Sequence, residues 1–560
     1  MQRSNSKANY IYSVVYQLLT VLTPLLTAPY LARVIGAEGA GIYSYFNNIA
    51  SYFAMFGMLG LTNYANRYIA RVRDDTGKLN YVFSSIYYMQ VVLGILVSVL
   101  YIVYTAFFVK DNQNICWILF LPVLATIINL TWFYWGLEEF KITVTRSILI
   151  KFVTIVCIFL FVKEKGDLWK YCLILSAGTF CGNIPLFLLL KKYVKFVKVD
   201  VQDILVHIKP NLILFVPVLS VSVYRTMDKI MLGWLSTYSS VGYYENIDKI
   251  INICLGFITA LGQVMLPKSA NLVARGKIEE SNRLIVKSFK FSTLFCSALV
   301  FGLISISDVF VPVFFGTEFL PSIGILMLLA PNLFLLAWGN VLKTQFLMPR
   351  GKDMAYIIST LLGAVINTVV NVMLIPIFSG IGAAIGTICA EFISLIYILW
   401  VIKSDFDIMK FFASVRYIVS GFIMMLGVVI VKQYVTVSLA GLFALIVTGA
   451  VIYAVECVIL AYFKDDLLLE PWWWTTSRVA VFPFSKRAVS LVRVTTRPSN
   501  STSLVSIFSK CAASIVFASF PDDNDAGSSL RQQSAGCQFK IEDKLRKIQQ
   551  KSRILNNLSG

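Results

Sequence analysis

The sequence predicts an all-α polytopic membrane protein of about fourteen transmembrane helices, arranged as two pseudo-symmetric six-helix lobes plus two extra helices. Three observations predict this fold class. The 560 residues are 58% apolar and only 14% charged, whereas a soluble globular chain carries about 25% charged residues. Apolar segments of about 20 residues, long enough to cross about 30 Å of hydrocarbon, recur along the chain. An internal repeat also relates its two halves.

Fourteen segments are long and apolar enough to span a bilayer. The first has no small-residue cleavage site after a short apolar core, so we expect a retained span and not a signal peptide. The second is amphipathic and is the least apolar of the set. The expected spans are 10–32, 40–63, 81–108, 114–136, 142–162, 168–190, 210–234, 242–266, 288–315, 321–347, 354–376, 379–402, 416–432 and 437–463.

The distribution of basic residues predicts the orientation. With the N-terminus in the cytoplasm, the inner connections and the N-terminal segment hold 22 Lys and Arg residues, and the outer connections hold 5. Cytoplasmic loops carry this excess, so both ends of the helical body are expected inside. No outer connection exceeds about ten residues. This weighs against a polysaccharide polymerase or ligase, in which we expect a large outer loop.

Charge and residue usage exclude several function classes. The net charge of +19 would suggest a nucleic-acid partner in a soluble chain, but most basic residues lie in short strips between apolar runs. That pattern is typical of loops facing anionic lipid, and we expect no nucleic-acid partner. His207 is the only histidine, and no Cys-x-x-Cys or His-x-x-x-His pair exists. We therefore expect no metal site and no enzyme activity, and a solvated His207.

The repeat has an offset of about 200 residues. Pro24 corresponds to Pro217, and segment 39–48 resembles segment 240–246. Six spans in each half make the repeats parallel, related by an axis along the membrane normal. We expect an N-lobe with a cytoplasmic linker, a C-lobe with its loop, two further helices and a cytoplasmic tail. Their ranges are 1–209, 210–415, 416–463 and 464–560.

Short motifs then carry a family resemblance over about residues 1–463. In order they are Pro29 to Gly36 with Gly39 and Gly41, Asn63 to Arg67 with Arg71, Gly136 to Lys141, Asp228 to Gly233, Val241 to Asn246, Val264 to Pro267, Phe315 to Phe319, Gln345 with Pro349 to Gly351, and Gly382 to Thr387 with Glu391. Together they resemble the bacterial polysaccharide flippases of the multidrug/oligosaccharidyl-lipid/polysaccharide (MOP) exporter superfamily.

The resemblance implies a MATE-like fold in the bacterial inner membrane. It implies a flippase that moves undecaprenyl-pyrophosphate-linked oligosaccharide repeat units from the inner to the outer leaflet by alternating access, for polysaccharide biosynthesis. No cofactor is expected beyond a coupling ion, Na⁺ or H⁺. The lipid bilayer and other membrane proteins of polysaccharide assembly are the expected partners. Two alternatives stay open: a multidrug/cation antiporter of the related branch and a membrane sugar polymerase.

Charged residues inside the membrane are the candidate site, because such charges are costly without a function or a partner. Arg225 lies about 22 Å above the start of the seventh span at about 1.5 Å per residue. The candidate substrate-binding cations of the cavity are Arg33, Lys151, Arg225, Lys229 and Lys249. The candidates for a gate or the coupling ion are Asp228, Glu245, Asp248 and Glu391. The candidate sugar contacts are Asn367 and Asn371.

Each set also has a structural interpretation. Arg225 with Asp228 and Glu245 with Lys249 have helical spacing and can neutralise each other locally. Arg33 can reach the outer interface instead of the cavity. The two asparagines are equally suited to bonds between helices. The sequence leaves these alternatives open.

Overall fold

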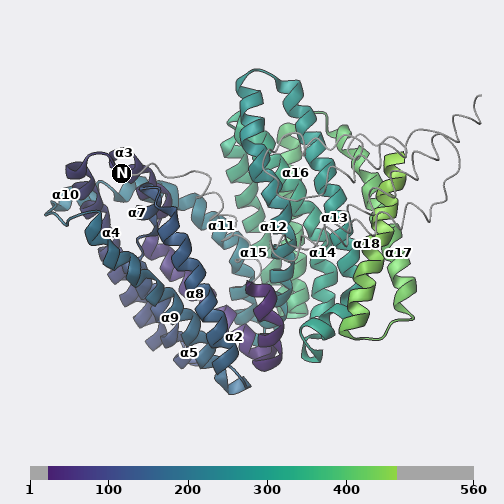
Figure 1. Cartoon of the computed structure of the whole chain (residues 1–560), viewed down its shortest axis with the longest axis horizontal. Helices are drawn as coiled ribbons and strands as arrows, with labels where there is room; N and C mark the ends of the chain where they lie inside the picture. The colour runs from purple at the N-terminus through teal and green to yellow at the C-terminus, as the bar shows by residue number, and fades with distance from the viewer. Residues whose placement is uncertain (1–22, 463–560) are drawn as a thin grey trace, which may run out of the picture. The chain divides into compact units, whose positions relative to one another are not determined.

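In a computed structural model of the chain, residues 23–462 are described (Figure 1). Residues 23–461 belong to one compact unit. The described residues form helices and connecting segments with no strand, as the composition predicts. Residues 23–34 are helical. The principal helices that follow are α2 (Gly36–Met58), α3 (Leu61–Val72), α4 (Thr76–Phe107), α5 (Gln113–Ile118), α6 (Phe120–Leu124), α7 (Thr131–Gly136), α8 (Phe140–Phe161), α9 (Leu168–Leu189), α10 (Val201–Leu205), α11 (Ile208–Leu235), α12 (Tyr238–Ala274), α13 (Ile278–Phe314), α14 (Ser322–Leu342), α15 (Asp353–Phe378), α16 (Gly380–Ile402), α17 (Val415–Lys432) and α18 (Leu439–Tyr462).

Ten helical segments in the described residues are long and apolar enough to cross a membrane. They correspond to ten of the fourteen expected spans, namely those in α4, α8, α9 and α12 to α18. Two expected spans have other forms: α2 with α3, and the broken segment 113–136. The expected span 210–234 lies within the continuous helix α11, which is not among the ten. The first span lies partly in residues 1–22, outside the described residues. The predicted cytoplasmic tail, 464–560, also lies outside them.

The second span is interrupted at Leu59, where φ is 44°. A β-carbon makes this backbone region costly, and the helix does not continue through it. The chain resumes as α3, whose exposed face carries polar and charged side chains. The expected second span is therefore two helices, α2 and the more polar α3, where the sequence predicts one.

The fourth span is also broken, and a side chain from another helix bonds to carbonyl groups at the break. Gln90 of α4 donates from Nε2 to the carbonyls of Thr126 (2.5 Å) and Asn129 (3.0 Å). Its Oε1 accepts from Trp132 Nε1 at 2.9 Å. One buried amide thus satisfies polar groups that an irregular segment exposes in an apolar interior.

Helices α12 and α13, each of 37 residues, are longer than the spans expected within them. At about 1.5 Å per residue each reaches about 55 Å, well beyond about 30 Å of hydrocarbon. The connection 267–287, between the expected spans 242–266 and 288–315, is therefore mostly helix. Only residues 275–277 separate the two helices.

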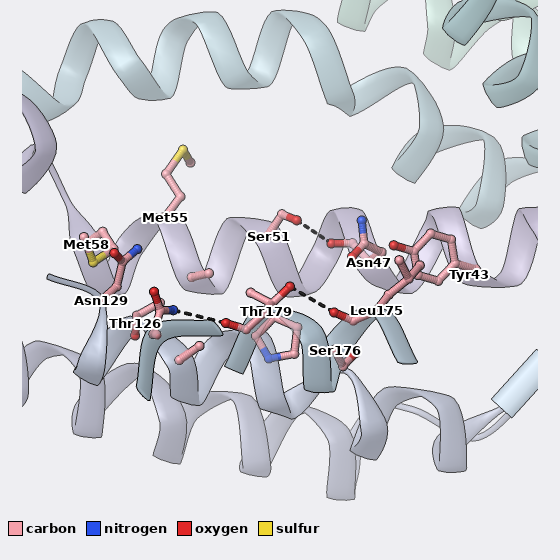
Figure 2. Close-up of a pocket in the computed structure, with 14 residues that line it drawn as sticks. Tyr43, Asn47, Ser51, Met55, Met58, Thr126, Asn129, Leu175, Ser176 and Thr179 are labelled. Carbon is pink, nitrogen blue, oxygen red and sulfur yellow. Dashed lines mark hydrogen bonds between the residues drawn. The ribbon is translucent and has the colours of Figure 1, made fainter. Parts of the chain in front are cut away.

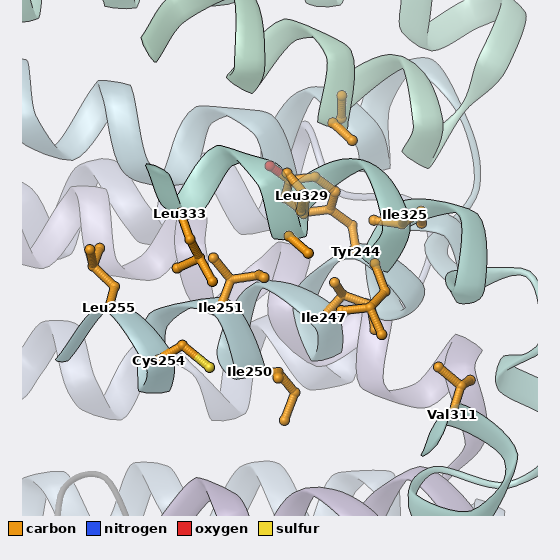
Figure 3. Packing of buried hydrophobic residues seen from close by; sticks show 14 of the residues in the cluster. Tyr244, Ile247, Ile250, Ile251, Cys254, Leu255, Val311, Ile325, Leu329 and Leu333 are labelled. Atoms are coloured by element: carbon orange, nitrogen blue, oxygen red, sulfur yellow. The ribbon is translucent and has the colours of Figure 1, made fainter. Parts of the chain in front are cut away.

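The C-terminal half of the body is held by an apolar core between α12 and α14. Tyr244, Ile247 and Ile251 of α12 pack near Leu329 and Leu333 of α14 (Figure 3). All five are at most 3% exposed. A separate core, around Tyr101 and Phe46, joins α2 and α4 in the N-terminal half. The two cores fit the predicted division into lobes, whose boundaries stay a prediction.

Candidate substrate and ion site

Lys229 is the centre of a charged cluster between α11 and α12. Its Nζ lies 2.6 Å from Glu245 Oε2 and 2.9 Å from Asp248 Oδ2. Lys249 Nζ lies 3.3 Å from Glu245 Oε1, and Ser44 of α2 donates to Glu245 Oε2 at 3.1 Å. The structure thus brings together four residues that the sequence singled out. In this arrangement the two lysines neutralise two carboxylates.

Asp228, the neighbouring residue, occupies a different environment. It is 3% exposed, and its carboxylate accepts hydrogen bonds from Asn371 Nδ2 (2.6 Å), Tyr244 OH (2.9 Å) and Thr387 Oγ1 (2.8 Å). Among the described residues no cation pairs with it. The helical spacing of Arg225 and Asp228 suggested mutual neutralisation, but the neutral donors come instead from α12, α15 and α16.

The two candidate sugar contacts belong to this Asp228 cluster. Asn367 and Asn371 are 2% and 0% exposed, and Asn371 Nδ2 also lies 3.2 Å from Asn367 Oδ1. Asn371 Oδ1 is buried with no hydrogen-bond partner. These contacts are the helix-to-helix bonds that the sequence left open as the alternative. With Thr387, the cluster collects oxygen atoms of the kind that bind a hard cation.

Arg225 is exposed on α11, one helical turn before the Asp228 carboxylate. It lies within electrostatic reach of Lys343, which in turn lies within reach of Glu391. Lys343 begins a π-helical turn, Lys343–Leu347, directly after α14. Sequence analysis missed Lys343 because it stands at the end of an expected span. A π-turn, which is frequent at functional sites, is not readable from hydrophobic periodicity.

Arg33 and Lys151 lie apart from these groups. Arg33 is exposed, and its Nη2 donates to the carbonyl of Val313 at 2.5 Å. Lys151 is half-buried on α8. Glu391 is 4% exposed on α16.

Residues of the two predicted lobes are in contact near Arg33. Glu318 accepts from the backbone N–H of Ala37 at 2.9 Å and pairs with Lys165 at 3.2 Å. Helices α2 and α12 cross at Gly41 and Gly242 in the same region. We call the contacts made by Arg33, Ala37, Gly41, Gly242 and Glu318 the outer seal, because this is the predicted outer end of the body.

His207, expected to be solvated, is 5% exposed, so that interpretation is wrong. Its Nδ1 lies 2.7 Å from Tyr64 OH and its Nε2 2.8 Å from Ser85 Oγ. Burial lowers the pKa of the imidazole. The basic residues around it in the sequence did not show that α3 and α4 would cover it. These two hydrogen bonds connect the start of α11 to α3 and α4 in the N-terminal lobe.

Comparisons with known proteins agree with the resemblance that the sequence motifs carry. Residues 6–273 match the family model "Polysaccharide biosynthesis protein". The "Putative O-antigen transporter" of Escherichia coli (strain K12) is 25% identical over 389 residues, 69% of this chain and 94% of that protein. A protein of the same description from Shigella dysenteriae is 23% identical over 68% of this chain and 96% of its own length.

Solved structures agree on the fold. The structure of "Lipid II flippase MurJ, inward closed conformation" has a TM-score of 0.67 and 14% identity, covering 82% of this chain and 99% of that one. An inward-facing multidrug resistance MATE family transporter of the MOP superfamily has a TM-score of 0.50 and 15% identity, covering 70% and 95%. The predicted fold class is confirmed. The family model and the curated relatives support the expected resemblance to polysaccharide flippases, and both of these relatives are described as O-antigen transporters.

Proposed function

We propose that the chain moves undecaprenyl-pyrophosphate-linked oligosaccharide repeat units from the inner to the outer leaflet by alternating access of its two lobes, for polysaccharide biosynthesis. The observation that carries this proposal is the Arg225 side chain, which is exposed on α11 and makes no ion pair with a described residue. A polar head with a pyrophosphate cannot enter hydrocarbon without a large free-energy cost. A cation that pairs with the pyrophosphate offsets that cost.

Arg225 is the better placed of the candidate cations on α11 and α12. Lys229 and Lys249 already pair with Glu245, whereas Arg225 makes no ion pair with a described residue. An incoming pyrophosphate therefore needs to break no existing pair to reach Arg225. A guanidinium also offers two parallel donors to one phosphate. We assign Lys229 and Lys249 to holding α11 against α12, with Glu245 and Asp248.

Asp228 is the proposed site of the coupling ion. A buried carboxylate among neutral donors either takes up a proton or binds a small cation such as Na⁺. Asn371 Oδ1, which has no hydrogen-bond partner, and Asn367 Oδ1 are the further oxygen ligands available to a cation. Asp228 connects α11 with α12, α15 and α16, so a change of its charge acts on four helices at once.

The proposed orientation places both ends of the helical body in the cytoplasm, as the excess of basic residues predicts. Cysteines introduced at Gly77 and Gly276 should react with an impermeant thiol reagent only from the cytoplasm. A cysteine at Ser239, beside the outer seal, should react from outside. Reaction of the Ser239 cysteine only from the cytoplasm would reverse the orientation.

The lipid intermediates of a deletion strain test the proposed function. Undecaprenyl-linked repeat units should accumulate on the inner leaflet, and surface polymer should disappear. Re-expression of the unmodified chain should restore export, while Arg225→Ala at equal abundance should not. Normal export with altered drug tolerance would instead support the antiporter. Accumulation of single exported repeat units, with no long polymer, would support the polymerase.

A further inference from the structure

The N-terminal lobe contains a cavity whose lining includes none of the charged residues on α11 and α12. It has a volume of about 390 Å³. This falls within the range of about 300–1,000 Å³ that small-molecule sites occupy. Its walls come from α2, from α9 and from the broken fourth span with its 3₁₀ turn Ala125–Ile128 (Figure 2).

The cavity lies at mid-membrane depth. Asn47 and Ser51 stand about 16–22 Å along α2 from its first residue, at about 1.5 Å per residue. Ser176 and Asn183 stand about 12–22 Å along α9. Both estimates are near the middle of about 30 Å of hydrocarbon. Polar groups at this depth are costly unless water or a ligand binds them.

The chemistry of the lining is polar without charge. Its polar members are hydroxyl and carboxamide side chains, and none of the lining residues is Asp, Glu, Lys, Arg or His. This composition does not complement a pyrophosphate, which needs cations. It does complement hydroxyl and acetamido groups, which both donate and accept hydrogen bonds.

Several of these groups are not bonded to the protein. Ser176 is 1% exposed, and its Oγ has no hydrogen-bond partner. Across the cavity, the Asn47 carboxamide and the Tyr43 hydroxyl make no hydrogen bond to any described residue. Ser51 Oγ and Thr179 Oγ1 donate to carbonyls of their own helices, at 2.7 and 3.0 Å, and so keep their acceptor capacity (Figure 2).

We propose that this cavity binds the saccharide of the lipid-linked substrate through uncharged hydrogen bonds, with Asn47 and Ser176 as its principal contacts. The inference rests on the proposed function and adds the place where sugar is recognised. It divides recognition between the lobes: cations on the C-terminal lobe hold the pyrophosphate, and neutral groups on the N-terminal lobe hold sugar. A sugar hydroxyl replaces the water that Ser176 and Asn47 otherwise need.

Two variants and a matched control test the cavity. Ser176→Ala removes the unpartnered hydroxyl, and Asn47→Leu replaces the carboxamide by an apolar group of similar size. Ser98→Ala is the control, because Ser98 on α4 is also buried with an unpartnered Oγ but does not line the cavity. The full chain in nanodiscs receives two probes, the lipid-linked saccharide extracted from the producing strain and undecaprenyl pyrophosphate without sugar. Native mass spectrometry measures the bound fraction of each.

Asn47→Leu and Ser176→Ala should each weaken binding of the saccharide-bearing lipid by about tenfold, the loss of about one well-formed hydrogen bond. Binding of undecaprenyl pyrophosphate should be unchanged, and Ser98→Ala should change neither. Equal binding of the saccharide-bearing lipid by all variants would overturn the cavity proposal, showing that the cavity holds water only. Equal weakening of both lipids would overturn it too. No binding of either lipid by the unmodified chain would overturn the proposed function itself.

Discussion

Gly41 of α2 and Gly242 of α12 face each other's helix backbone across the outer seal. A β-carbon on Gly41 would lie 1.7 Å from the Tyr238 carbonyl oxygen, and one on Gly242 would lie 2.0 Å from the Ala37 carbonyl oxygen. The two glycines occupy equivalent positions of the internal repeat. An axis that relates the lobes brings equivalent helices together at equivalent residues, so each glycine is needed for the same reason.

Gly242→Ala should therefore separate the lobes at the outer seal, because backbone atoms cannot move aside as a flexible side chain can. Overpacking of this kind costs about 1–3 kcal/mol. A cysteine at Ser44, which is 3% exposed beside Glu245, should react faster with a thiol reagent in this background. Gly256→Ala on the same helix is the control, since a β-carbon there meets nothing within 4 Å. Equal reaction rates in both backgrounds would contradict the steric account.

Lys229→Met should destabilise the protein strongly. It leaves Glu245 and Asp248 without their shared partner, and breaking a buried pair costs about 3–5 kcal/mol. Lys249→Met should cost less than about 1 kcal/mol, because Lys249 is more exposed and has one partner at 3.3 Å. Thermal unfolding midpoints in nanodiscs compare the two variants. A larger effect at Lys249 would contradict this hierarchy.

The double variant Arg225→Ala with Asp228→Ala should not recover transport. Each single change should abolish export, since Arg225 is the proposed pyrophosphate contact and Asp228 the proposed ion site. The Asp228 carboxylate accepts hydrogen bonds from Asn371, Tyr244 and Thr387 and does not pair with Arg225. Removing both charges therefore does not restore a neutral pair. Surface polymer and protein abundance measure the outcome. A rescued double variant would show that the two residues only neutralise each other.

Arg225→Lys should retain part of the export that Arg225→Ala loses. Lysine preserves the positive charge but lacks the planar pair of donors. The matched change Lys249→Arg, within the pair that Lys249 makes with Glu245, should leave export nearly unchanged. Surface polymer at equal protein abundance gives both results. Full activity of Arg225→Ala would exclude this side chain from substrate binding.

His207 should make stability depend on pH. Burial lowers the pKa of the folded imidazole below the ordinary value of 6.5, although nearby Asp203 acts in the opposite direction. The unfolded chain then binds more protons as the pH falls through about 6.5, and the folded state loses stability. The thermal midpoint should fall between pH 7.5 and about 5.5 by more in the unmodified chain than in His207→Gln. Identical pH dependence in both proteins would contradict the role of burial.

The sequence predicts the regular spans well and the tertiary contacts poorly. Segments such as α15 and α16 are apolar over a full membrane thickness, and length with composition suffices to find them. The bond from Asn371 to Asp228 joins residues 143 positions apart, and no helical period reports it. For the same reason the sequence singled out both residues without pairing them, and left Asn371 open between a sugar contact and a bond between helices. The exposure of His207 was predicted wrongly, because charged neighbours in the sequence do not indicate which helices pack against a residue.

Reconstituted transport tests the central claim most directly. The purified chain in liposomes that carry lipid-linked saccharide from the producing strain should move the saccharide to the opposite leaflet, where an enzyme added outside modifies it. Liposomes with Arg225→Ala at equal protein content should match protein-free liposomes. Transfer by the unmodified chain with loss in the variant is the result that the account predicts. No transfer above the protein-free rate, under any imposed sodium or proton gradient, would contradict it.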